Sequence, residues 1–213
     1  NEAIKRVYNF TRANFCDWYI EFAKTRFYGE DLEDRKTAQS VSVHVIRKLL
    51  QLLHPYCPFI TEELWGCFKF QDEELLISTL WPAVDSSQID KNVESEIHIL
   101  MDVITAVRNI RASLNVSPGK EASLTIRGDE KKCNMLRTNE NYIQRLAKLE
   151  KIQMGEKEEK PPKSATAVIK GLELFVPLAG LIDINKEIER LNKQITAMNG
   201  RLTAVNHKLE NKN

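Results

Sequence analysis

The side chains of this sequence that could act on a ligand are aromatic and basic, and they recur at helical spacing. Trp18, Tyr19 and Lys24 lie in one aromatic, apolar segment, and Arg108 and Arg111 close another. Flat rings can stack on planar ligands, and cations can neutralise phosphates. The same pattern is typical of a packed helix core with a solvated charged face, so both interpretations stay open. Four more cations lie near the C-terminal end: Arg190, Lys193, Arg201 and Lys208.

No arrangement of residues typical of a catalytic or metal site accompanies these side chains. His44 and His54 have no second histidine or acid at metal-ligand spacing, so we expect them to pack or to cap helices. The sequence has neither a phosphate-cradling glycine loop nor the pattern of a hydrolytic triad. The cysteines also lack metal-type spacing, which predicts buried free thiols in a reducing compartment rather than disulfides. They are Cys16, Cys57, Cys67 and Cys133.

Charge and composition narrow the class of protein. The 213 residues carry 31 basic and 30 acidic side chains, a net charge of +1, and 42% are apolar. Any contact with a polyanion must therefore come from a local patch rather than from bulk charge. No 18-residue apolar run or signal-like start is present, so we expect neither a membrane span nor secretion. Because the chain starts at Asn1 without Met, we expect a piece of a longer protein.

The first predicted domain, residues 1–81, is a bundle of helices built around a proline corner. Apolar periodicity predicts a helix over 2–27, ended by Gly29, and another from Thr37 to Leu53. Pro55 and Pro58 then fix φ and force the chain to kink. A second helix restarts with Thr61 as its expected cap, and the corner is lined by aromatic and aliphatic side chains: Tyr56, Phe59, Ile60, Leu64 and Trp65.

A polar, aperiodic linker at 82–92 leads into a predicted α+β unit at 93–180. Helical periodicity covers 93–113 and 130–149, and alternation or short apolar runs predict strands at 122–127, 151–154, 165–170 and 172–177. The fold class is therefore mainly α with a small α+β unit.

The last segment, 181–213, has the clearest periodicity in the chain. Apolar residues from Leu181 to Leu209 are spaced alternately three and four apart, which predicts one long coiled-coil helix. Asp183 is its expected cap, and Gly200 interrupts it at a cost of about 1 kcal/mol. The heptads alone equally predict a module for oligomerisation or interaction, without RNA specificity.

Two segments have a distinctive sequence, namely His54 to Trp65 (HPYCPFITEELW) with Trp81-Pro82, and Phe15 to Tyr19 (FCDWY). They resemble the C-terminal part of class I aminoacyl-tRNA synthetases, and specifically the valyl-tRNA synthetase family. Two more are similar to that family, residues 106–111 (AVRNIR) with 115–118 (NVSP), and residues 174–183 (LFVPLAGLID). Together they cover most of the chain in the family's order.

The resemblance implies a bundle that recognises the anticodon and an antiparallel coiled coil that braces the tRNA elbow. The parent would be a cytoplasmic ligase that joins valine to tRNA(Val) using ATP with magnesium, with catalytic and editing domains elsewhere in the same chain. The family's His-x-Gly-His and Lys-Met-Ser-Lys-Ser types of string do not occur here, so no cofactor and no catalytic residue is expected in this segment. Part of the family's bundle would precede Asn1, so we expect this segment to hold only part of the anticodon site. The partner strand of the coiled coil would follow Asn213, which leaves a seam open to self-association.

The resemblance also assigns a role to the aromatic and basic side chains. The rings would stack on unpaired bases and the cations would neutralise phosphates. The tRNA-binding candidates are Trp18, Tyr19, Lys24, Arg108, Arg111, Arg190, Lys193, Arg201 and Lys208.

Overall fold

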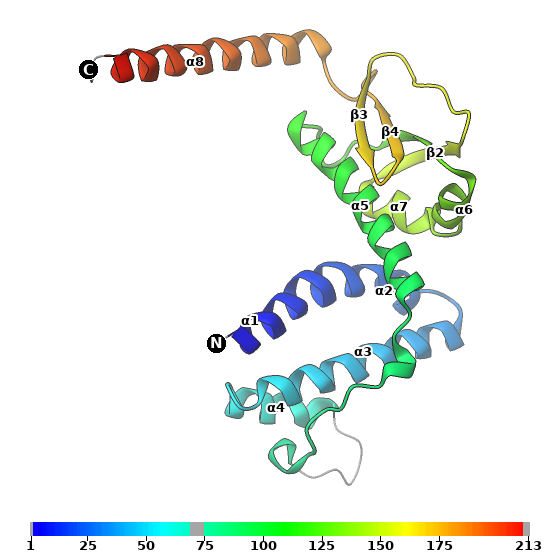
Figure 1. Ribbon diagram of the computed structural model, residues 1–213. Coiled ribbons are helices and arrows are strands. Elements are labelled where there is room, and N and C mark those ends of the chain that lie inside the picture. The colour runs from blue at the N-terminus through cyan, green and yellow to red at the C-terminus, as the bar shows by residue number, and fades with distance from the viewer. Residues whose placement is uncertain (1, 69–74, 211–213) are drawn as a thin grey trace. The chain divides into compact units, whose positions relative to one another are not determined.

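The computed structural model describes residues 2–68 and 75–210, and they fall into two compact units, Asn1–Asp90 and Lys91–Asn213 (Figure 1). The first unit is helical. The second packs helices on a four-stranded sheet and continues into a long C-terminal helix. The predicted fold class, mainly α with a small α+β unit, is confirmed. The finer division into 1–81, 82–92, 93–180 and 181–213 stays a prediction.

The first helical segment is continuous but not uniformly α-helical. It consists of α1 (Glu2–Asn9), the π-helical η1 (Phe10–Tyr19) and α2 (Ile20–Phe27). The expected broad apolar face is not buried as a stripe, because a π turn holds more residues than an α turn and shifts the 3.6-residue register. Phe15 and Ala23 are its buried side chains.

Helix α3 (Leu32–Leu53) begins five residues earlier than predicted. Asp31 caps it, because its carboxylate accepts hydrogen bonds from the backbone N–H groups of Glu33 (2.9 Å) and Asp34 (3.1 Å). The charged run that the sequence pattern left outside the helix is therefore its first turn, where acids favour the positive helix end.

The proline corner forms as expected, but Thr61 is not its cap. Helix α4 (Pro58–Phe68) starts at Pro58, a residue suited to the first helical position because it has no N–H to satisfy. The Thr61 hydroxyl lies inside the helix, donating to the Cys57 carbonyl (2.8 Å), and His54 Nδ1 lies 2.8 Å from it. His54 is thus a packed, hydrogen-bonded histidine.

The core of this corner is smaller than the apolar run suggested. Trp65 is buried with Leu50 and Leu76, and the guanidinium of Arg47 stacks over its ring at 4.3 Å. The Glu62 carboxylate accepts from the Leu76 N–H (2.7 Å) and holds the 3₁₀ turn η2 (Leu76–Ser78) against α4. A second 3₁₀ turn, η3 (Ser86–Gln88), follows. Residues 69–74 of the first predicted domain lie outside the described residues.

The second unit is built on a sheet of order β2-β1-β4-β3. Its strands are β1 (Ala122–Arg127), β2 (Leu149–Gly155), β3 (Ser164–Ile169) and β4 (Leu172–Pro177). The pair β1 and β2 is parallel, and the other two pairs are antiparallel. The predicted bounds of β1 and β4 are confirmed, and β2 extends beyond the predicted 151–154.

Helices cover this sheet and supply its core. Helix α5 (Lys91–Ser113) contacts β3, β4 and α7 (Figure 1). It buries a stripe of side chains that includes Val103, Ile104 and Val107. The predicted single helix over 130–149 is wrong, because it breaks at Asn139 into α6 (Glu130–Thr138) and α7 (Glu140–Ala147).

Helix α8 (Ile184–Glu210) is the predicted long helix, and its cap is confirmed. The Asp183 carboxylate accepts from the N–H groups of Asn185 (3.1 Å) and Lys186 (3.2 Å). Leu181 is buried and Ile184 is half-buried, but the later seam residues are exposed: Ile188, Leu191, Ile195, Met198, Leu202, Val205 and Leu209.

The prediction that the cysteines are buried is correct for Cys133 alone. Cys16, Cys57 and Cys67 are free and exposed. Burial raises the pKa of the Cys133 thiol. Over the described ranges 2–68 and 75–210, no helix is long and apolar enough to cross a membrane.

Candidate nucleic-acid interface

The aromatic candidates of the first unit are half-buried and already stacked within their own helical segment. Trp18 stacks on Phe22 with ring centroids 5.7 Å apart, and Tyr19 stacks on Phe15 at 5.5 Å. The Tyr19 hydroxyl donates to the carbonyl of Ala38 at 3.4 Å, which ties this segment to α3. Each ring is thereby covered on one face by its stacking partner.

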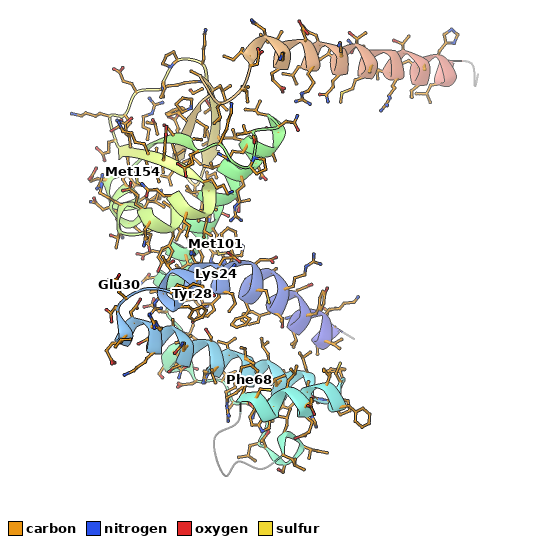
Figure 2. All side chains as sticks on the ribbon, turned by 180° about the vertical axis from the view of Figure 1, so that it is seen from behind. Lys24, Tyr28, Glu30, Phe68, Met101 and Met154 are labelled. Carbon is orange, nitrogen blue, oxygen red and sulfur yellow. The ribbon has the colours of Figure 1, made fainter. Side chains whose placement is uncertain are left out.

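Lys24 lies on α2, where Figure 2 labels it, in an ion pair with Glu21 one turn earlier. Both side chains are partly exposed. A partly exposed pair on one helix is weak, so a stronger anion could take the ammonium from Glu21.

More exposed rings lie at the proline corner, outside the set of predicted tRNA-binding residues. Phe59 is 91% exposed and Trp81 is 63% exposed. Phe59 also lines a hollow of about 660 Å³ beside Trp65 and Ile77. Helical spacing could have indicated that Phe59 is exposed. Thr61 and Trp65, the buried residues of α4, are four residues apart and share one face of the helix, whereas Phe59 lies off that face.

Arg108 and Arg111 lie near the C-terminal end of α5, but their hydrogen bonds reach the end of α7. Arg108 Nε donates to the Leu146 carbonyl (2.9 Å), and Arg111 Nη1 donates to the Lys148 carbonyl (3.3 Å). The last carbonyls of a helix are unpaired and make its C-terminus negative, so the C-terminal end of α7 attracts both cations. Arg108 is exposed.

Arg111 is only 8% exposed and also donates to the carbonyls of Ser117 (3.4 Å) and Lys120 (2.6 Å). It therefore organises the loop after α5. Sequence spacing placed it at the end of the helix without indicating that it turns inward.

The cations of α8 divide into an anchored one and exposed ones. Arg190 is hydrogen-bonded to Glu187 (2.8 Å) and donates to the Ser113 carbonyl (3.1 Å), so it holds the start of α8 to the end of α5. The bond to Arg190 lowers the pKa of Glu187, and the bond to Glu187 raises the pKa of Arg190. Lys193 and Arg201 are exposed. Lys208 lies in α8, but its side chain is outside the described part of the chain.

The structure brings some of these candidates together within each unit. Trp18, Tyr19 and Lys24 share one helical segment of the first unit, and Arg108, Arg111 and Arg190 gather around the end of α5 in the second. Lys193 and Arg201 extend along α8 away from that group. Within the described ranges, no group of three His, Cys, Asp or Glu side chains could hold a metal ion.

Residues 1–126 match the family model described as the anticodon-binding domain of tRNA ligase. The chain belongs to this family. The predicted resemblance to the anticodon-binding part of a tRNA ligase is thereby confirmed. The matched range holds Trp18, Tyr19, Lys24, Arg108 and Arg111, whereas α8 lies beyond it.

Curated relatives extend the similarity through most of the chain. It is 38% identical to proteins named valine–tRNA ligase from Bacillus cereus and Bacillus subtilis, and 40% identical to one from Listeria innocua. Each alignment runs over 191 residues, 89% of this chain, but covers only 22% of the relative. The chain thus spans about a fifth of the length of these relatives.

Proposed function

We propose that this chain is the tRNA-binding C-terminal part of a valine–tRNA ligase. The observation that carries the proposal is the 38–40% identity, over 89% of the chain, to relatives named for valine. Membership of the anticodon-binding domain family supports the choice of tRNA as partner. The parent enzyme would attach valine to tRNA(Val) with ATP in the cytoplasm, and its catalytic and editing domains would be further partners of this segment.

The two units supply different contacts in this proposal. The first unit faces the anticodon, with unpaired bases meeting the outer faces or edges of Trp18 and Tyr19 and a phosphate meeting Lys24. In the second unit, Arg108 and the cations Lys193, Arg201 and Lys208 of α8 neutralise the backbone toward the tRNA elbow. Arg111 and Arg190 act by holding the loop after α5 and the base of α8 in place.

ATP and magnesium do not fit the residues of this segment. Neither signature string for the nucleotide occurs in the sequence, and the described residues gather no carboxylate cluster for a metal ion. We therefore derive no catalytic step here, and the contribution of the chain is to bind and orient tRNA.

The test is the affinity of the 213-residue chain for valine tRNA and for the same tRNA with an altered anticodon, at two salt concentrations. We expect tighter binding to the valine anticodon, and weaker binding of both tRNAs at higher salt because phosphate contacts release counterions. Equal affinities would contradict anticodon recognition. Absence of binding at both salt concentrations would contradict the tRNA-binding function.

A second candidate function is self-association, and the exposed seam of α8 favours it. Its side chains from Ile188 to Leu209 are 42–66% exposed, although they have the spacing of a coiled-coil core. If the seam pairs with that of a second chain, sedimentation should give a mass of two or more chains. The double variant Leu191→Glu with Leu202→Glu should then be a monomer. A monomeric wild-type chain over the whole concentration range would exclude this function.

A further inference from the structure

Three cations near the ends of α5 and α7 are held by backbone carbonyls rather than by carboxylates. Arg111 donates to the carbonyls of Ser117, Lys120 and Lys148. Lys148 Nζ donates to the Pro118 carbonyl at 2.9 Å, and Lys120 Nζ donates to the carbonyls of Gly180 and Leu181, each at 3.1 Å. Together they fasten the loop that joins α5 to β1.

A hydrogen bond to a backbone carbonyl does not neutralise the charge of a cation. A carbonyl is neutral, so a lysine or arginine bound to it keeps a full positive charge. Elsewhere in the described chain many cations pair with acids, as Arg26 does with Asp34 at 2.7 Å and Lys170 with Asp102 at 2.7 Å. The concentration of unmatched positive charge around one loop is therefore a local feature in a chain whose net charge is only +1.

The surface beside these cations is hollowed on both sides of Lys148. One hollow, of about 340 Å³, is lined by Arg108, Arg111 and Lys148 together with apolar side chains of α5 and α7. The other, of about 440 Å³, is lined by Lys148 and Arg145 and has Glu121 as its one acid. Cations thus outnumber acids in both hollows, which favours an anion.

Lys148 is fixed between the two hollows by the backbone. It ends α7 in the left-handed conformation, with φ 55°, and its own carbonyl accepts from Arg111. Its ammonium is exposed at the surface while bonded to Pro118. An anion that approaches Lys148 meets a cation whose position is already set, so little side-chain entropy remains to be lost.

We propose that Lys148, with Arg108, binds a phosphate of the RNA backbone at this junction of α5 and α7. The proposal rests on the proposed tRNA-binding function and adds to it a contact that the spacing of the sequence did not indicate. Backbone contacts carry no base information, so this surface serves to position the tRNA. Arg111 is a positioning residue, because it holds the loop and the Lys148 backbone.

The test compares Lys148→Asn with Lys163→Asn in the full 213-residue chain. Asparagine removes the charge and tolerates the left-handed backbone. Lys163 is a close match, because it is an exposed lysine with φ 52° that precedes β3, at the opposite edge of the sheet from β2. Thermal melting of both variants checks that the fold is kept.

The quantity measured is the slope of log affinity against log salt for a valine tRNA transcript. Loss of one phosphate contact in Lys148→Asn should reduce the steepness of the slope by about 1, equally for a tRNA with an altered anticodon. Lys163→Asn should keep the wild-type slope. A Lys148→Asn slope like that of the wild type overturns this inference but leaves the proposed function intact. A wild-type chain that does not bind tRNA overturns both.

Discussion

At the scale of single residues, the environment of a side chain decides its role more than its type or position in the sequence does. Arg108 and Arg111 are three residues apart on α5, yet the first is exposed and the second is 8% exposed with three carbonyl partners. Their spacing placed both on one helix end, but the inward turn of Arg111 depends on loop carbonyls that come later in the chain. No local pattern could predict that.

Arg111→Met tests this structural role. Removing the buried guanidinium takes a charged hydrogen-bond donor from three carbonyls, of which those of Ser117 and Lys148 keep a backbone N–H partner, and should lower the free energy of unfolding by about 1.5–3 kcal/mol. Urea denaturation followed by circular dichroism measures it. The control is Arg108→Met, which should cost less than about 1 kcal/mol because Arg108 is exposed and its hydrogen bond to the Leu146 carbonyl competes with water. Equal losses for the two variants would contradict the assignment.

The cysteines give a second residue-scale prediction. Cys133 is buried and its thiol has a raised pKa, so at neutral pH it is both protonated and covered. Because the thiolate is the reactive form, iodoacetamide should label Cys16, Cys57 and Cys67 in the native chain and reach Cys133 only in urea. Mass spectrometry of the labelled peptides measures this. Rapid native labelling of Cys133 would show that the core of the second unit opens.

At the scale of elements, sequence patterns worked where one local signal decides the structure. Strand β4 has its predicted bounds, because its alternation is marked off by Gly171, whose φ of 80° suits glycine. Asp183 caps α8 as expected. The π-helical η1 and the break at Asn139 were missed, because both depend on which carbonyl each N–H finally bonds.

Gly200 allows a direct test of α8 as an element. A Cβ there would meet nothing within 4 Å, so Gly200→Ala gains helix propensity without a clash. It should stabilise the helix by about 1 kcal/mol and raise the helical signal in circular dichroism.

The matched control for that change is Gly180→Ala, just before α8. Gly180 has φ +74° and also has open space around it, so the added methyl group strains the backbone without a steric contact. It should lower stability. A loss of helical signal in Gly200→Ala would mean that α8 is not a regular helix through that position.

At the scale of the whole molecule, the family and the fold class could be predicted from the sequence, whereas only part of the binding surface could be. The proline corner carries a sequence motif of the family and the seam of α8 carries its periodicity, and each lies within a single segment of the chain. The surface around Lys148 combines α5, the loop after it and α7, and that loop is tied through Lys120 to the segment before α8. Such a combination depends on tertiary packing, which no single stretch of sequence encodes.

The arm formed by α8 leads to a prediction for the whole complex. Arg201→Ala with Lys208→Ala should weaken tRNA binding by the same factor for different anticodons and reduce its salt dependence, because these cations would meet only phosphates. Filter binding measures both quantities. The control double variant Lys131→Ala with Lys157→Ala removes the same charge from exposed positions outside α8 and should bind like the wild type. Unchanged binding by the α8 variant would exclude the arm from the interface.

A chemical footprint of tRNA(Val) bound to the 213-residue chain tests the proposed tRNA-binding function most directly. We expect protection of the unpaired anticodon bases and, separately, of backbone positions at the tRNA elbow. Protection confined to the acceptor end, or no protection under conditions where binding is saturated, would contradict the claim that this chain holds tRNA by its anticodon and elbow.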